Sequence, residues 1–171
     1  MEEMATGTLV SVHEYLTASY RPDCDYVDGV IVERNVGEHD HSRLQIRLGG
    51  YLLSRERQCG IHALTEQRVQ VKPTRFRVPD LCVVLAAASY EPIFKNPPFL
   101  CIEILSKDDG MSDMQERIND YLALGVNYVW VLDPRTRRAF VCTPGQMREC
   151  TDGVLRTAAP EIVVPLAELF D

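Results

Sequence analysis

The sequence contains no long apolar run and no closely spaced pair of cysteines. No segment approaches the roughly 18 consecutive apolar residues that a membrane span needs. The N-terminal segment MEEMATGTLVSV lacks a basic stretch followed by an apolar one, so it is not typical of a secretory signal. None of the six cysteines forms a C-x-x-C pair, and without an export signal we expect reduced thiols. These absences indicate a cytoplasmic protein with no membrane segment.

The composition is that of a globular protein. Of the 171 residues, 46% are apolar and 25% are charged, and this length suits a single domain over residues 1–171 with one core. The net charge is −7. Because nucleic-acid binding draws most of its affinity from Lys and Arg at phosphates, this balance argues against unspecific coating of DNA by a monomer. It is compatible with carboxylates gathered around a divalent metal and with basic residues clustered locally.

Apolar periodicity predicts a mixed α/β sheet with helices on its faces and an N-terminal extension of one helix and one strand. Helices are expected at residues 11–19, from the segment GEHDHS onward with Asp40 or Ser42 as its cap, and at Asp113–Leu124 with an end near Gly125. Strands are expected at Val30–Arg34, His62–Lys72, Leu81–Ala86, Phe99–Leu105, Asn127–Leu132 and Arg138–Cys142. The continuous apolar runs at residues 81–86 and 99–105 are typical of central strands that are buried on both faces.

Two acidic residues lie where acidic side chains are costly. Asp80 follows Pro79 and opens the apolar segment LCVVL, and Glu103 lies inside the segment FLCIEIL. A carboxylate in such a strand needs a cation or several hydrogen-bond donors, or else it stays protonated. If the two strands are neighbours, both carboxylates meet at one end of the sheet, where their oxygens would select Mg²⁺ or Mn²⁺ over softer metals. On position alone, a turn-capping Asp80 and a Glu103 paired with a buried arginine are equally good interpretations.

The segments VPDLCVV, PPFLCIEILS and DMQERINDYLALGVNYVWVLDP, in this order, resemble a bacterial family of restriction endonucleases within the PD-(D/E)XK superfamily. The resemblance runs from EYL near residue 14 to VLDP at residues 131–134. It includes the DYVDG turn at residues 25–29 and His41. It implies a restriction-endonuclease-like fold, with a mixed sheet flanked by helices, and a nuclease activity.

The resemblance also implies roles for individual residues. In that superfamily the Asp and the Glu bind Mg²⁺, which positions a water and stabilises charge on the phosphate. Asp80 and Glu103 are then the metal ligands, joined by the backbone carbonyl of Ile104. Asp25 stands where relatives usually carry a glutamate in a helper role. Since Asp is one methylene shorter, shaping the turn is an equally good interpretation of Asp25.

The sequence departs from the (D/E)XK pattern at position 105, which holds Leu105 instead of lysine. Relatives move the lysine into the following helix, four residues before a tyrosine, where this chain has Arg117 ahead of Tyr121. On a helical wheel Arg117 falls within the apolar arc, so its stem can lie along the core while the guanidinium reaches carboxylates or phosphate. An arginine stays charged and cannot act as a general base, but it can stabilise developing negative charge. The alternative is an ordinary i, i+4 ion pair with Asp113.

Other polar residues are weaker candidates for the site. His39 and His41 flank Asp40 and could ligate a metal, although such residues more often cap or line the start of a helix. Gln67 could lie near the site. Lys107 could replace the missing lysine, but it stands in the polar stretch SKDDG, which is typical of a solvated loop.

The first hypothesis is a Mg²⁺- or Mn²⁺-dependent endonuclease that hydrolyses DNA. Asp80 and Glu103 would hold the metal, and Arg117 would steady the phosphate. We expect a homodimer, because a small nuclease domain must present two sites to cut both strands. The second hypothesis is a catalytically weak or inactive module of the same fold that binds nucleic acid or a protein partner, and the missing lysine and the acidic charge favour it.

Overall fold

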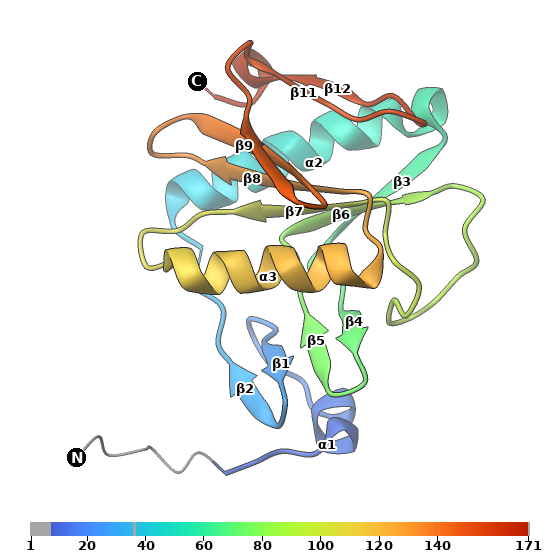
Figure 1. Ribbon diagram of the computed structural model, residues 1–171, viewed down its shortest axis with the longest axis vertical. Coiled ribbons are helices and arrows are strands. Elements are labelled where there is room, and N and C mark those ends of the chain that lie inside the picture. The colour runs from blue at the N-terminus through green and yellow to red at the C-terminus, as the bar shows by residue number, and fades with distance from the viewer. Residues whose placement is uncertain (1–7, 36, 171) are drawn as a thin grey trace.

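The larger β-sheet has the strand order β10-β9-β8-β7-β6-β3 in the computed structural model, which describes residues 8–35 and 37–170 (Figure 1). Its strands are β3 (Ile61–Thr65), β6 (Leu81–Leu85), β7 (Leu100–Ile104), β8 (Tyr128–Asp133), β9 (Arg138–Thr143) and β10 (Gln146–Glu149). Strands β7 and β8 run parallel, and the other neighbouring pairs of this sheet are antiparallel. A parallel pair needs a crossover connection, and the helix α3 (Met111–Leu124) supplies it.

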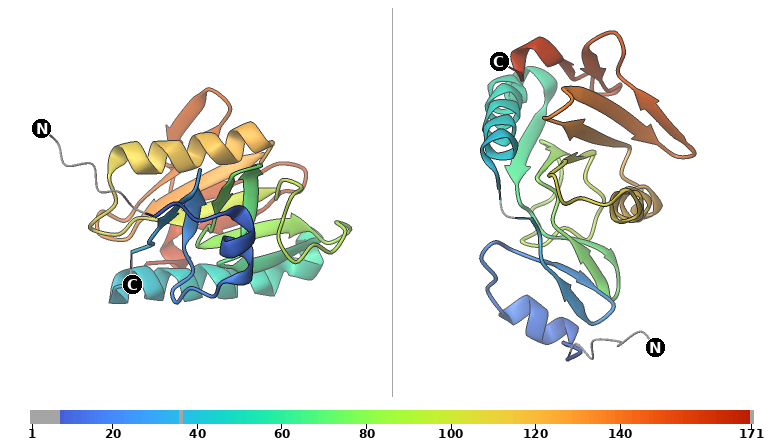
Figure 2. Two further views of the ribbon diagram at one scale, coloured as in Figure 1. Left: turned by 90° about the horizontal axis from the view of Figure 1, so that it is seen from below. Right: turned by 90° about the vertical axis from the view of Figure 1, so that its left-hand side faces the viewer.

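Two helices cover opposite faces of the larger sheet. The helix α2 (His39–Cys59) lies on one face and α3 lies on the other (Figure 2). Side chains alternate between the two faces along each strand, so Leu100 and Ile102 of β7 pack in the cluster with α2 while Cys101 packs in the cluster with α3. Because Glu103 has the same parity as Cys101, its side chain points toward α3.

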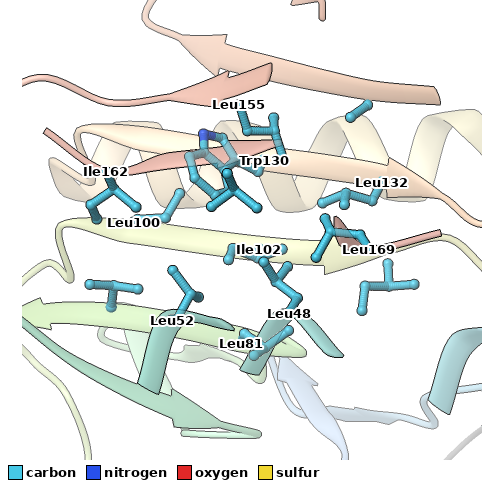
Figure 3. Packing of buried hydrophobic residues seen from close by; sticks show 14 of the residues in the cluster. Leu48, Leu52, Leu81, Leu100, Ile102, Trp130, Leu132, Leu155, Ile162 and Leu169 are labelled. Atoms are coloured by element: carbon cyan, nitrogen blue, oxygen red, sulfur yellow. The ribbon is translucent and has the colours of Figure 1, made fainter. Parts of the chain in front are cut away.

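The face toward α2 holds the larger hydrophobic cluster. Leu48 and Leu52 of α2 lie over Leu81, Ile102 and Trp130 of the sheet (Figure 3). The hairpin of β11 (Val154–Arg156) and β12 (Val163–Pro165), followed by the 3-10 helix η1 (Leu166–Glu168), contributes Leu155, Ile162, Val164 and Leu169 to this cluster. The C-terminal hairpin therefore covers the part of the sheet that α2 leaves open.

A smaller sheet lies beyond one end of the larger one and has the strand order β2-β1-β5-β4 (Figure 1). Its strands are β1 (Asp25–Val27), β2 (Val30–Val32), β4 (Val69–Lys72) and β5 (Arg75–Arg77). The short helix α1 (Val12–Thr17) packs on this sheet through Tyr15, whose ring centroid lies 5.1 Å from that of Tyr26 and 5.3 Å from that of Phe76. The smaller sheet therefore joins the N-terminal strands β1 and β2 to β5 and β4 from the middle of the chain.

The structure confirms the predicted mixed α/β fold and most of its elements. The three helices and the central strands β6, β7 and β8 lie where the sequence places them. Gly60 and Gly125 end α2 and α3 in the left-handed region, with φ of 67° and 111°. The predicted cap of α2 is wrong: its N-cap is Glu38, and among the described residues no side chain bonds to cap this helix.

The expectation of one strand over His62–Lys72 is also wrong. This segment divides into β3 and β4, which belong to different sheets. Glu66 adopts a left-handed φ of 51° between them, and such a residue turns the chain out of an extended path.

The structure bears on two expectations stated above, that the cysteines are reduced and that no segment spans a membrane. The cysteines at positions 24, 59, 82, 101, 142 and 150 are all free thiols. Within the described ranges, no helix combines the length and the apolar character needed to cross a bilayer.

Candidate active site

Asp80 lies at the junction of the two sheets, immediately before β6. Strand β6 pairs with β7 in an antiparallel register that sets Leu81 opposite Ile102, so the preceding Asp80 comes beside Glu103. The backbone N–H of Ile104 donates a 2.8 Å hydrogen bond to Oδ2 of Asp80. Gln45 of α2 donates a 3.0 Å bond to the backbone carbonyl of Asp80. These bonds fix the carboxylate of Asp80 against the end of β7.

Glu103 reaches the same place from the central strand β7. It is 2% exposed, and its side chain enters the space between β7 and α3. The hydroxyl of Tyr121, on α3, donates a 2.6 Å hydrogen bond to Oε1. Nη1 of Arg117 lies 3.8 Å from Oε2, which is longer than a hydrogen bond. The carboxyl group of Glu103 therefore has one close donor on one of its oxygens.

Asp80 and Glu103 line one small cavity of about 20 Å³, together with Arg34, Asn35, His41, Ile104, Ser106, Asp109 and Arg117. A space of this size holds roughly one water molecule or ion. The lining residues come from α2, β7 and α3, from the position just before β6, and from the segments after β2 and β7. The two acidic residues picked out in the sequence thus converge on one ion-sized space.

A guanidinium group and an imidazole ring lie next to Asp80. Nη2 of Arg34 donates to Oδ1 at 2.5 Å, and Nε2 of His41 lies 3.4 Å from the same oxygen. Asp80 is 4% exposed, so this is a buried ion pair. Breaking such a pair by removing one partner typically costs about 3–5 kcal/mol.

Arg117 projects from α3 into a group of three carboxylates. Its guanidinium nitrogens lie 3.7 Å from Oδ2 of Asp25, 3.8 Å from Oε2 of Glu103 and 3.7 Å from Oδ1 of Asp109. The charges of these neighbours raise the pKa of Arg117 against the opposing effect of its burial. The alternative partner from the sequence, Asp113, is not among the ion pairs of Arg117 in the described part of the chain.

Asp25 lies behind Arg117 and does not line the cavity. It is 2% exposed, accepts a 2.9 Å bond from the backbone N–H of Val78, and accepts a 3.1 Å bond from Nη1 of Arg77. Arg77 in turn donates a 2.8 Å bond from Nε to Asp120 of α3. This buried chain of charges ties β1, β5 and α3 together and holds the guanidinium of Arg117 from behind.

The two central carboxyl groups differ in their pKa. Burial raises the pKa of Glu103 to about 8; the charge of Arg117 opposes the rise and that of Asp80 adds to it. Burial also disfavours ionisation of Asp80, but the hydrogen bond from His41 and the charge of Arg34 outweigh it and lower the pKa of Asp80. The same hydrogen bond raises the pKa of His41. Asp80 is therefore charged at neutral pH, while Glu103 largely keeps its proton.

The donors around the cavity fit a hard divalent cation. Among the described residues, no group of three or more His, Cys, Asp and Glu side chains is placed to hold a metal. Mg²⁺, however, keeps several waters and binds proteins through one or two carboxylates, and Asp80, Glu103 and the carbonyl of Ile104 would suffice. Burial raises the pKa of Glu103 in spite of the charge of Arg117, and a divalent ion beside the carboxyl group would favour its ionised form.

The structure also places the weaker candidates. His41 faces Asp80, whereas the exposed His39 pairs with its neighbour Asp40 at 3.0 Å. Gln67 bonds to the carbonyl of Pro92 and does not line the cavity. Lys107 is exposed and pairs with Glu38 at 2.8 Å, so it does not take the place of the missing lysine.

Sequence reasoning missed Arg34 and Asp109. Both line the cavity; Arg34 ends the predicted strand Val30–Arg34, and Asp109 stands in the polar stretch SKDDG. Asp109 accepts a 2.7 Å bond from the backbone N–H of Ser106 and lies near Arg117. Their contacts with Asp80 and Arg117 depend on how the segments after β2 and β7 lie against the site, and a local sequence pattern does not report such contacts.

A mixed sheet flanked by helices, with an Asp and a Glu converging at the ends of adjacent strands, has the architecture of a nuclease fold. The chain belongs to the Uma2 family, described as "Putative restriction endonuclease", whose model matches residues 12–167. The crystal structure of a "putative nuclease" from Anabaena variabilis ATCC 29413 is similar to this chain, with a TM-score of 0.80 and 23% sequence identity. The similarity covers 94% of this chain and 97% of that one. No curated protein matches the chain.

Proposed function

We propose that this protein is a metal-dependent endonuclease that hydrolyses phosphodiester bonds in DNA, with Mg²⁺ or Mn²⁺ as its cofactor. Asp80, Glu103 and the carbonyl of Ile104 would hold the ion. The observation that carries the proposal is the convergence of both acids and Arg117 on one ion-sized cavity in a member of a restriction endonuclease family. A buried carboxyl group is costly to ionise without a cation, and a divalent ion held by both acids would stabilise their charged forms.

The side chains around the cavity have distinct parts in the proposed reaction. The chemistry that a divalent ion supplies in such a site is an activated water and neutralisation of charge on the phosphate. Arg117 binds a phosphate oxygen and stabilises the negative charge that develops there. Asp25 positions Arg117 through its contact at 3.7 Å. Tyr121 holds Oε1 of Glu103, and Oε2 lies 3.8 Å from Nη1 of Arg117.

Basic residues near the site suit a nucleic-acid backbone despite the net charge of −7. His39 and Arg43 of α2 line a pocket of about 140 Å³ together with Arg137 from the turn between β8 and β9. That turn starts next to the site, since Leu132 of β8 pairs with Ile104 of β7. Phosphates of a bound strand could contact these arginines while another phosphate lies in the cavity. For cleavage of both strands, the proposed enzyme would act as a homodimer in the cytoplasm.

The second candidate function is a catalytically weak or inactive module of the same fold. Two observations favour it: Leu105 stands where the (D/E)XK pattern has lysine, and Asp80 already carries the guanidinium of Arg34. Such a module would bind nucleic acid or a protein partner without needing a metal.

Calorimetric titration with Mg²⁺ and Mn²⁺, combined with plasmid cleavage, separates the two functions. The wild type is compared with Asp80→Ala and with a control, Asp152→Ala, which removes an exposed carboxylate that pairs with Arg156. The endonuclease proposal predicts metal uptake and cleavage in the wild type and in the control, and the loss of both in Asp80→Ala. No uptake at millimolar metal by the wild type would favour the inactive module.

A further inference from the structure

Arg34 stands where a divalent ion would have to approach Asp80. Its Nη2 is 2.5 Å from Oδ1, and Oδ2 already accepts the 2.8 Å bond from the N–H of Ile104. Both oxygens of Asp80 are thus engaged by the protein. An ion held by Asp80 and Glu103 would lie beside a guanidinium of like charge, in a site where burial strengthens the repulsion.

The side chain of Arg34 has a second anchor away from the cavity. Nη1 lies 3.8 Å from Oε1 of Glu66, whose side chain is 47% exposed, while the side chain of Arg34 is only 10% exposed. Glu66 is close enough to pair with the guanidinium of Arg34 if that group moves away from Asp80. Arg117, in contrast, lies among the carboxyl groups of Asp25, Glu103 and Asp109.

We propose that Arg34 occupies the cation position on Asp80 in the metal-free protein and competes with the divalent ion for that carboxylate. This inference rests on the proposed function, because it concerns the same metal ligands. In the metal-free state the ion pair keeps the buried Asp80 charged. Metal binding requires the guanidinium to move away from Oδ1, toward Glu66, so part of the metal's binding free energy is used to displace it. The two cations are therefore negatively coupled at Asp80.

The direction in which a substitution of Arg34 changes the metal affinity distinguishes competition from a purely structural role of this residue. Substituting a residue that only supports the fold weakens metal binding or leaves it unchanged. Removing a competitor strengthens it. The variant Arg34→Met keeps an apolar stem of similar length and removes the charge, so we expect it to bind Mn²⁺ about tenfold more tightly than the wild type.

Calorimetric titration with Mn²⁺ alone tests the proposal on the wild type and three variants. The double variant Arg34→Met/Asp80→Asn should lose the gain, because the contested carboxylate is gone. The control Arg138→Met removes an exposed arginine that pairs with Glu149, and it should bind like the wild type. Equal or weaker binding by a folded Arg34→Met overturns the role of Arg34 and leaves the proposed function standing if the wild type still binds metal and cleaves DNA.

Two further outcomes of the titration distinguish the competition of Arg34 from the proposed function. Metal uptake by Arg34→Met but not by the wild type supports the competition and shows that the native chain is held in its metal-free form. Uptake by neither protein removes both proposals. Should Arg34→Met fail to fold, a crystal structure of the wild type soaked in Mn²⁺ decides: an ion on Asp80 with Arg34 moved off Oδ1 supports the proposal, and an ion bound beside an unchanged ion pair overturns it.

Discussion

The hydroxyl group of Tyr121 lies 2.6 Å from Oε1 of Glu103 and joins α3 to the central strand β7 at the floor of the candidate site. Both residues are buried. This hydrogen bond favours the ionised form of Glu103, although burial outweighs it and the pKa of Glu103 is raised to about 8. Tyr121 therefore lowers the pKa of Glu103 relative to what burial alone would give, and an ionised Glu103 binds a cation more readily.

Tyr121→Phe is expected to weaken metal binding at neutral pH. The ring still fills its place in the core, but the pKa of Glu103 rises further, so a cation competes with a more tightly held proton. A net loss of about 1 kcal/mol corresponds to roughly fivefold weaker binding of Mn²⁺. Titrations at pH 7 and pH 9 measure it. The control Tyr128→Phe removes a hydroxyl that bonds to the N–H of Ala158, and an equal loss there would contradict the role of Tyr121.

Glu103→Gln is expected to change how stability depends on pH. The carboxyl group has a pKa near 8 in the folded protein and about 4.3 in the unfolded chain. Between these values the folded protein binds more protons, so the free energy of unfolding of the wild type falls as pH rises. The variant carries no such proton and lacks this decline.

Urea unfolding at pH 5, 7 and 9 in a metal chelator measures the difference for Glu103→Gln. The variant should gain stability relative to the wild type from pH 5 to pH 9. Ionisation of Asp80 lies below this window, because its pKa is lowered, and titration of His41 occurs in both proteins. A difference between the two proteins that stays constant over this range would show that Glu103 is already ionised at pH 5.

Arg117→Lys is expected to leave DNA cleavage equal to that of the wild type or to raise it. A lysine keeps the positive charge near Asp25 and Glu103 and is the residue that the resemblance implies for this helix. Arg117→Met should be less stable by about 3–5 kcal/mol, because it leaves buried carboxylates without their cation. Plasmid cleavage and urea unfolding give the two measurements. A large loss of cleavage in a stable Arg117→Lys would show that the two-pronged guanidinium itself is needed.

Arg137→Gln is expected to weaken DNA binding uniformly across sequences, with little effect on metal affinity. If Arg137 contacts one phosphate, the slope of log K against log salt should become shallower by about 0.9. Fluorescence anisotropy with a duplex in a metal chelator, over a range of salt concentrations, measures that slope. Arg156→Gln makes the same charge change at an exposed residue paired with Asp152. If the slope of log K against log salt is the same for Arg137→Gln and Arg156→Gln, Arg137 does not contact a phosphate of the bound DNA.

Local patterns in the sequence predicted the elements of the fold well where packing follows periodicity. The apolar stripe of α2 and the continuous apolar strand β7 are set by which residues avoid water, and the structure buries them; β6 is buried over residues 81–83, while Leu85 at its end is 43% exposed. The division of residues 62–72 between two sheets could not be predicted. The sequence is typical of a strand on both sides of Glu66, and it does not show that the chain turns at this residue. The three-residue strand β1 is too short to show a period.

The sequence by itself determined that Asp80 and Glu103 are acids in apolar strands and that position 105 lacks the lysine. Only the tertiary structure decided which charges meet them. The antiparallel register of β6 and β7 sets the two acids side by side, and the smaller sheet brings Arg34 onto Asp80 from 46 positions away in the chain. Local hydrophobicity predicts which residues are buried. The partner of a buried charge depends instead on contacts between distant segments, and a local sequence pattern does not predict them.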